Sequence, residues 1–172
     1  PWQVHYKGKD PKLAEGQARL EALVAGHYGG IVFPIYLPDK PPKGGVSHIA
    51  DADAIFATIE KIIARSPSFL PLLAPHAEPG KISTFLSIEG AGPFADDVAA
   101  IDRFIARGLR LVSPCHMKNS GLASSATGEK VSFGLTEKGR AFAERVYQRG
   151  ALIDVSHGSD RTFDDLSPIA KR

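Results

Sequence analysis

The stretch Gly150-Ala-Leu-Ile-Asp-Val-Ser-His157-Gly-Ser-Asp160 decides the fold and locates the chemistry of this chain. A run of small and apolar residues leads toward His157, which stands where a buried strand is expected to end, and a helical segment starts near Asp160. In parallel α/β folds the C-terminal ends of the strands carry the chemistry. A histidine at such an end is a candidate metal ligand or general base.

Two earlier strand-like runs end in the same way. Residues 82–89 read Ile-Ser-Thr-Phe-Leu-Ser-Ile-Glu, and residues 108–116 read Gly-Leu-Arg-Leu-Val-Ser-Pro-Cys-His. Three strand ends therefore offer Glu89, His116 and His157. One such residue alone is more often a solvated carboxylate or a structural histidine. Three at successive strand ends favour a shared site.

Helix-like and strand-like segments alternate along the chain. Strands are expected at residues 29–37, 82–89, 109–113 and 151–156, and helices at residues 11–25, 51–65, 96–107 and 136–149. Strands separated by helices of roughly 10–15 residues imply right-handed βαβ crossovers. We therefore predict that the four strands are adjacent and parallel, with the helices packed outside.

Two features modify this pattern. Pro34 within the first strand indicates a bulge or the end of the strand. The Gly-, Ser- and Ala-rich stretch 117–133 is a long connection, and long connections often shape active sites.

Composition places the chain among ordinary folded domains. Of its 172 residues, 43% are hydrophobic and 23% are charged, and the net charge is +2. Lysines and arginines are scattered, so nucleic-acid binding has no electrostatic basis. No apolar run approaches the roughly 20 residues that a membrane helix needs. The sequence shows neither a signal peptide nor a membrane segment, so cytoplasmic and exported locations both stay open.

The single cysteine, Cys115, excludes an internal disulfide and any zinc site built from several cysteines. Because Cys115 adjoins His116, a reactive thiol is one interpretation, and a buried residue at a strand end is the commoner one. His48 is followed by Asp51 and Asp53, and we interpret this group as a loop and the acidic start of a helix rather than as a metal cluster.

Five segments carry a resemblance to a known family. They are Gly-Gly-Ile-Val-Phe-Pro-Ile-Tyr-Leu-Pro (29–38), Ser-Ile-Glu-Gly (87–90), Ser-Pro-Cys-His-Met-Lys-Asn (113–119), Gly-Leu-Thr-Glu-Lys-Gly (134–139) and Ile-Asp-Val-Ser-His (153–157). Together they resemble the membrane dipeptidase (renal dipeptidase) family of zinc peptidases, within the amidohydrolase superfamily. The resemblance runs from about Leu20 to the end of the chain, and the last two segments are its most specific parts.

The resemblance implies a fold and an activity. The fold is α/β, a TIM (β/α)8 barrel, of which residues 1–172 would be a partial single domain that supplies roughly strands two to five. The activity is hydrolysis of the peptide bond of dipeptides by a water molecule that bridges two zinc ions. Two such ions lower the pKa of the water and polarise the carbonyl group.

The resemblance also assigns roles to individual residues. Glu89 resembles the carboxylate that bridges both zinc ions, and His157 resembles a ligand of the second ion. His116 resembles the histidine that contacts the substrate and helps to stabilise the tetrahedral intermediate. Cys115 stands where the family usually has threonine before this histidine.

One family motif is missing. The His-x-Asp pair that ends the family's first strand and binds the first zinc occurs nowhere in the sequence, and the family's later histidine, arginine and aspartate would lie beyond Arg172. A complete TIM barrel takes about 250 residues. We therefore expect the remainder of the barrel to come from the same longer chain or from an associated fragment. The alternative is a non-catalytic or incomplete barrel relative that binds a ligand or partner without hydrolysis, and a homodimer also stays open.

These 172 residues by themselves are expected neither to hold two zinc ions nor to cleave dipeptides. The reason is that Glu89 and His157 are fewer than the three or four protein ligands usual at a zinc site. Recombinant protein of this sequence, stripped of metal and reconstituted with zinc, can be assayed for the release of amino acids from a simple dipeptide. Robust turnover, with mass spectrometry finding no additional chain, would contradict this expectation.

Overall fold

The computed structural model describes residues 5, 7–8, 18–41, 44–129 and 131–170. Within these ranges four strands form one sheet in the order β1-β2-β3-β4. The strands are β1 (Gly30–Tyr36), β2 (Ser83–Glu89), β3 (Leu109–Ser113) and β4 (Leu152–Ile153). Every neighbouring pair is parallel. The predicted order and direction of the four strands are therefore confirmed.

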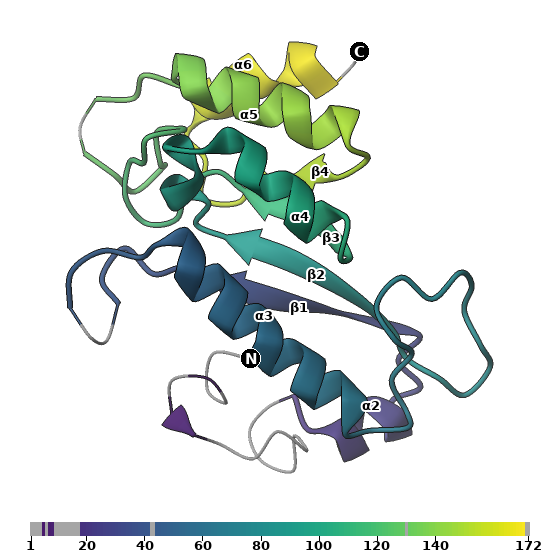
Figure 1. Ribbon diagram of the computed structural model, residues 1–172. Helices are drawn as coiled ribbons and strands as arrows, with labels where there is room; N and C mark the ends of the chain where they lie inside the picture. The colour runs from purple at the N-terminus through teal and green to yellow at the C-terminus, as the bar shows by residue number, and fades with distance from the viewer. Residues whose placement is uncertain (1–4, 6, 9–17, 42–43, 130, 171–172) are drawn as a thin grey trace.

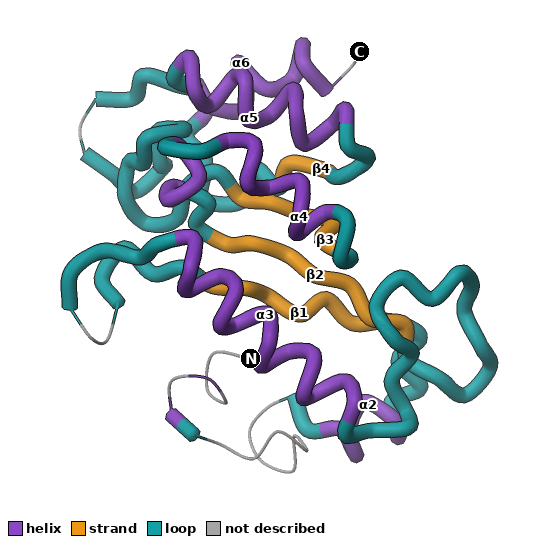
Figure 2. Tube along the Cα trace, viewed as in Figure 1, coloured by secondary structure: helices purple, strands orange, loops and turns teal. Residues whose placement is uncertain are grey.

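Helices cover one face of this sheet. They are α2 (Leu20–Ala25), α3 (Ile49–Ala64), α4 (Ile101–Ile105), α5 (Glu137–Gln148) and α6 (Asp160–Ala170), with short 3₁₀ turns η1 (Gly92–Ala95) and η2 (Val98–Ala100). In Figure 1, α3 and α4 cross the sheet on the same side, and α5 and α6 pack near β4. Figure 2 shows the loops that follow the strands gathered at one end of the sheet, on the left of the view. None of the helices in the described ranges is long and apolar enough to span a bilayer.

The two faces of the sheet differ in burial. The strand residues that point toward the helices are buried, and they are Phe33, Ile35, Leu86, Ile88, Val112 and Ile153. They form one core with the apolar sides of α3 and α4. Residues one position along each strand point to the opposite face, where Val32 is 40% exposed and Phe85 is 44% exposed. Tyr36 and Glu89 lie at the end of this second face, which in a closed barrel points to the interior.

Pro34 lies within β1, not at a bulge or at the end of the strand. The backbone N–H of Leu37 donates to the carbonyl of Glu89 in β2 at 2.9 Å. Because successive residues of a strand direct their amides to alternate sides, the nitrogen of Pro34 points away from β2, toward the edge of the described sheet. Proline is tolerated there because no hydrogen bond to β2 depends on its missing N–H.

The first two predicted helices have different bounds in the structure. Most of the helix predicted over residues 11–25 lies outside the described residues, and α2 occupies its last part. The helix predicted over residues 51–65 begins at Ile49, because the Asp51 carboxylate accepts a hydrogen bond from the backbone N–H of His48 at 2.7 Å and caps the helix. His48 thus stands at a helix start, as interpreted from the sequence.

The helix predicted over residues 96–107 is shorter in the structure, where η2 is followed directly by α4. Asp97 sets its start, because its Oδ1 accepts hydrogen bonds from the backbone N–H groups of Ala99 and Ala100, at 3.1 and 3.2 Å, and caps η2. A residue at the N-cap stands outside the helix, so the helical segment begins after Asp97 and not at Asp96.

The strand predicted over residues 151–156 is correct only for Leu152 and Ile153. The Asp154 carboxylate accepts a hydrogen bond from the backbone N–H of Ser156 at 2.9 Å, which bends the chain out of the sheet. The following segment therefore approaches the other strand ends as a turn.

Helix α5 starts close to the loop that precedes it. The hydroxyl of Thr136 accepts from the backbone N–H of Gly139 at 2.9 Å and donates to the carbonyl of Gly121 at 2.7 Å. Thr136 is therefore the N-cap of α5. A Cβ atom at Gly139 would collide with the backbone carbonyl of Leu122. Only glycine lets the helix lie this close to the loop.

Replacement of Gly139 by alanine should destabilise the protein. Alanine usually stabilises a helix by roughly 0.5–1 kcal/mol relative to glycine, but here the added methyl group overlaps the Leu122 carbonyl. We expect the free energy of unfolding, measured in urea, to fall by about 1–3 kcal/mol. Gly29→Ala is the control, because a Cβ atom there meets no atom within 4 Å. Equal or greater stability of Gly139→Ala would contradict this account.

Candidate metal centre

Glu89 is the last residue of β2 and stands at the end of the face opposite the helices. In the sheet it is in register with Tyr36 of β1 and Ser113 of β3. Gly90 follows with a φ of +85°, and a Cβ atom at Gly90 would lie 2.6 Å from the carbonyl oxygen of Leu37. Glycine is required for so close a turn. This packing explains the Glu-Gly pair in the sequence.

His116 lies just beyond the end of β3. Its Nε2 atom is 3.5 Å from Glu89 Oε1, and its side chain is 15% exposed. Its ring centroid is 4.4 Å from that of His157. The hydroxyl of Ser125 donates to the backbone carbonyl of His116 at 2.6 Å and fixes the chain there.

His157 reaches the same point from the turn after β4. Its Nε2 atom is 3.1 Å from Glu89 Oε1. Its φ of +68° lies in the left-handed region, where residues other than glycine are uncommon and tend to mark functional sites. The backbone holds it there, because the His157 carbonyl accepts from the N–H of Ala126 at 2.8 Å and from the thiol of Cys115 at 3.6 Å.

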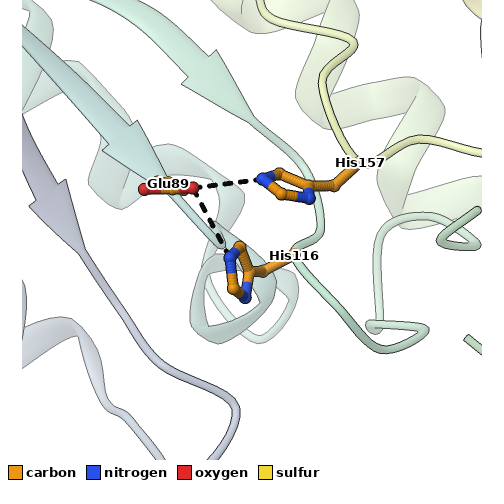
Figure 3. A group of neighbouring side chains, drawn as sticks. All are labelled: Glu89, His116 and His157. Atoms are coloured by element: carbon orange, nitrogen blue, oxygen red, sulfur yellow. Dashed lines mark hydrogen bonds and ion pairs between the residues drawn. The ribbon is translucent and has the colours of Figure 1, made fainter. Parts of the chain in front are cut away.

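Glu89, His116 and His157 form one cluster, as Figure 3 shows. Each offers one ligand atom, and the three atoms lie within 4.8 Å of one another. It is the one such group of potential metal ligands in the described part of the chain. Two imidazole nitrogens and a carboxylate oxygen suit zinc, and the three side chains are only partly buried. The arrangement therefore fits a metal ion in both its donor atoms and their spacing.

The long loop predicted over residues 117–133 contacts this cluster and helps to hold it. The hydroxyl of Ser124 is 2.8 Å from that of Ser159, and it accepts from the backbone N–H of Gly134 at 2.9 Å. The backbone N–H of Ser159 in turn donates to the carbonyl of Ser124 at 3.0 Å. These bonds tie the loop to the turn that carries His157. Sequence reasoning missed both serines, because small polar residues in a loop give no pattern.

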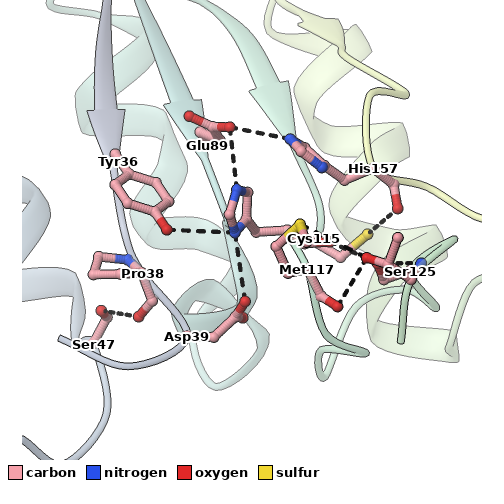
Figure 4. A network of polar contacts seen from close by, with 11 residues as sticks. Tyr36, Pro38, Asp39, Ser47, Glu89, Cys115, Met117, Ser125 and His157 are labelled. Carbon is pink, nitrogen blue, oxygen red and sulfur yellow. Dashed lines mark hydrogen bonds and ion pairs between the residues drawn. The ribbon is translucent and has the colours of Figure 1, made fainter. Parts of the chain in front are cut away.

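Two more residues near the cluster were missed from the sequence. The hydroxyl of Tyr36 is 3.4 Å from His116 Nδ1, and Asp39 Oδ2 is 3.5 Å from the same atom (Figure 4). Burial raises the pKa of the Tyr36 hydroxyl, and the charges of Asp39 and Glu89 raise it further, so the hydroxyl keeps its proton at neutral pH. Both residues stand at or just after the end of β1, where the rule that located Glu89 could have found them.

Solved structures of a metallo peptidase and an amidohydrolase share this fold. A metallo peptidase from Rhodobacter sphaeroides, liganded with a phosphinate mimic of the dipeptide L-Ala-D-Ala, matches with a TM-score of 0.75 at 19% identity, over 98% of this chain and 56% of that chain. An amidohydrolase from Pseudomonas aeruginosa matches with a TM-score of 0.74 at 18% identity, over 92% of this chain and 48% of that chain. The fold is therefore the parallel α/β fold of these hydrolases, and the chain corresponds to about half of each.

Sequence comparison identifies the family within this class. Residues 1–172 match the membrane dipeptidase family, peptidase family M19, and the chain belongs to it. Dipeptidase tcpJ of Claviceps purpurea is 26% identical over 98% of this chain and 43% of its own length. Dipeptidase verJ of Clonostachys rogersoniana is 25% identical over 88% of this chain and 43% of its own length. The chain thus spans less than half the length of these curated relatives, and the resemblance noted in the sequence is confirmed.

Cys115 is a buried residue beside the site, with 1% of its surface exposed. Burial raises the pKa of its thiol from 9.0 to about 11, and the charge of Asp39 adds to the shift. The thiolate is the reactive form of cysteine. The interpretation of Cys115 as a buried residue near a strand end is therefore confirmed.

The thiol of folded Cys115 should react slowly with Ellman's reagent at pH 8. Its pKa of about 11 leaves less thiolate in the folded chain than in the unfolded chain, where the pKa is near 9.0. Reaction should accelerate in guanidinium chloride, and in the folded protein as the pH rises toward 11. Cys115 is the single cysteine, so the absorbance change reports on it alone. Rapid stoichiometric labelling of the native protein at pH 8 would contradict this.

Proposed function

We propose that this chain forms part of a zinc-dependent dipeptidase. The main support is that Glu89 and His157 meet at the strand ends, where His157 Nε2 lies 3.1 Å from Glu89 Oε1. The chain that carries them belongs to the membrane dipeptidase family. The Rhodobacter sphaeroides relative in fold holds a phosphinate mimic of a dipeptide. That ligand supports a dipeptide as the substrate class.

In this proposal Glu89 and His157 hold the metal. A carboxylate has two oxygens and can bridge two ions, whereas an imidazole gives one nitrogen to one ion. Zinc ions bound there would supply a water nucleophile of lowered pKa and would polarise the peptide carbonyl. Residues 1–172 would be one part of a barrel domain, and the remainder of the barrel would supply the other ligands. That remainder belongs to the same longer chain or to an associated fragment.

His116 acts on the substrate rather than on the metal in this proposal. Its Nε2 atom faces Glu89 at 3.5 Å, and its side chain is largely shielded from solvent. An N–H group in such a place can donate to the oxygen of the scissile carbonyl as negative charge develops there. A donor that is fixed before the reaction costs no reorganisation when the charge appears.

One observation favours a second function, binding without hydrolysis. The sequence contains no His-x-Asp pair, the motif that the family resemblance assigns to the first zinc. A relative that lacks this zinc would retain part of the site and bind a ligand or partner. The two functions differ in their zinc content, because hydrolysis by a bridged water requires two ions per barrel.

Substitutions in protein that contains the whole barrel separate the proposed roles. Glu89→Ala should abolish dipeptide hydrolysis and lower the bound zinc, because the Glu89 carboxylate would hold both ions. His157→Ala should also lower the bound zinc. His116→Ala should keep its zinc and mainly lower kcat. Zinc is measured by inductively coupled plasma mass spectrometry, and turnover is measured by the release of amino acids.

His76→Ala is the matched control, because His76 is exposed and lies outside the cluster. It should leave zinc and turnover unchanged. Wild-type activity and zinc content in Glu89→Ala would refute the metal role of Glu89. Loss of zinc in His116→Ala would make His116 a ligand.

A further inference from the structure

We propose that Asp39 and Tyr36 are positioning residues for His116. They contact its Nδ1 atom and thereby keep its Nε2 atom directed at Glu89 and the substrate. The catalytic consequence of this inference rests on the function proposed above. The orientation of the ring does not, because it follows from contacts within the described chain.

The contacts of His116 divide between its two nitrogens. Nε2 faces Glu89, whereas Nδ1 faces the hydroxyl of Tyr36 at 3.4 Å and the carboxylate of Asp39 at 3.5 Å. Figure 4 shows Tyr36 and Asp39 together on the side of the imidazole away from Glu89. A half-turn of the ring would replace each nitrogen by a carbon and lose the contacts on both sides. One ring orientation therefore satisfies all three neighbours.

The chemistry of the neighbours suits this orientation of the ring. A carboxylate only accepts hydrogen bonds, whereas a tyrosine hydroxyl can donate or accept. A hydrogen bond from Nδ1 to Asp39 and one from Nε2 to Glu89 are therefore both possible in this orientation, at 3.5 Å each. Asp39 and Tyr36 on one side of the ring thus keep Nε2 on the side of Glu89 and the substrate. Hydrogen-bond partners of this kind orient functional histidines, and their loss typically costs roughly 10–100-fold in affinity or activity.

Both partners are held by their surroundings. Tyr36 lies in β1, and its ring packs against that of His116 with centroids 4.9 Å apart and planes at 65°. Asp39 follows Pro38, whose carbonyl accepts a hydrogen bond from the hydroxyl of Ser47 at 2.8 Å. Tyr36 thus comes from a strand. Asp39 comes from a loop whose start, at Pro38, is hydrogen-bonded to Ser47 near its end. Supports of this kind keep a functional side chain within the narrow range of positions that catalysis requires.

The surroundings also provide a matched control. Asp39 and His116 line a cavity of about 510 Å³ between the loops that follow β1, β2 and β3, and Asp96 lies on the same cavity. The Asp96 side chain is 94% exposed and pairs with Lys138 at 3.5 Å. Asp96→Asn thus removes the same charge from the same cavity as Asp39→Asn, without removing a contact of His116.

The kinetic test uses protein that contains the whole barrel, with zinc bound. Asp39→Asn should lower kcat for dipeptide hydrolysis about 10–100-fold, with KM and zinc content unchanged. Tyr36→Phe keeps the ring and should have a smaller effect in the same direction. Asp39→Glu restores the carboxylate and should recover part of kcat. Asp96→Asn should behave as wild type. Wild-type kcat in Asp39→Asn would overturn the inference.

The second readout is the orientation of the His116 ring in the metal-free protein, from crystal structures of wild type and of the Tyr36→Phe/Asp39→Asn double variant. Wild type should show one ring position, with Nδ1 beside Tyr36 and Asp39 and Nε2 beside Glu89. The double variant should show the ring displaced or in several positions. An unchanged ring in the double variant would overturn the inference. If wild type hydrolyses no dipeptide, the proposed function fails, and these structures still decide the positioning role.

Discussion

The candidate site depends on the register of the parallel strands. Tyr36, Glu89 and Ser113 are neighbours across β1, β2 and β3, so these three strands end at the same level. Side chains that leave the ends of parallel strands then meet over one edge of the sheet. A shift of β2 by one residue would turn Glu89 toward the helices and remove it from the histidines. The buried alternation of Leu86 and Ile88 prevents that shift, because it would expose both.

The register of the strands determines where the site lies. Hydrogen bonds from side chains to the backbone determine where each histidine stands within it. Neither histidine lies in a strand, so each depends on a loop for its place. Ser125 holds the carbonyl of His116, and Ser124 bonds with the turn that carries His157. Both serines belong to the long loop between β3 and α5. One loop therefore sets the distance between the two imidazole rings.

The repeating features were predictable from the sequence, whereas the local ones were not. The order and direction of the strands follow from apolar runs and their spacing, and the same pattern brought Glu89, His116 and His157 together. The predicted bounds failed where one side chain bonds to the nearby backbone, as Asp97 does at the start of η2 and as Asp154 does at the end of β4. The contacts of Asp39 follow from the path of an irregular loop. Such a path has no periodic pattern in the sequence, so these contacts could not be predicted.

The left-handed backbone of His157 brings stability and function into opposition. A residue other than glycine or asparagine in this region costs of order 1–3 kcal/mol, and the bonds from Ala126 and Cys115 must offset that cost. Glycine at this position would relieve the strain and remove the imidazole in one step. A substitution that makes the fold more stable at this position therefore removes a side chain of the site. A histidine persists at position 157 only while selection for its side chain outweighs the gain in stability that glycine would bring there.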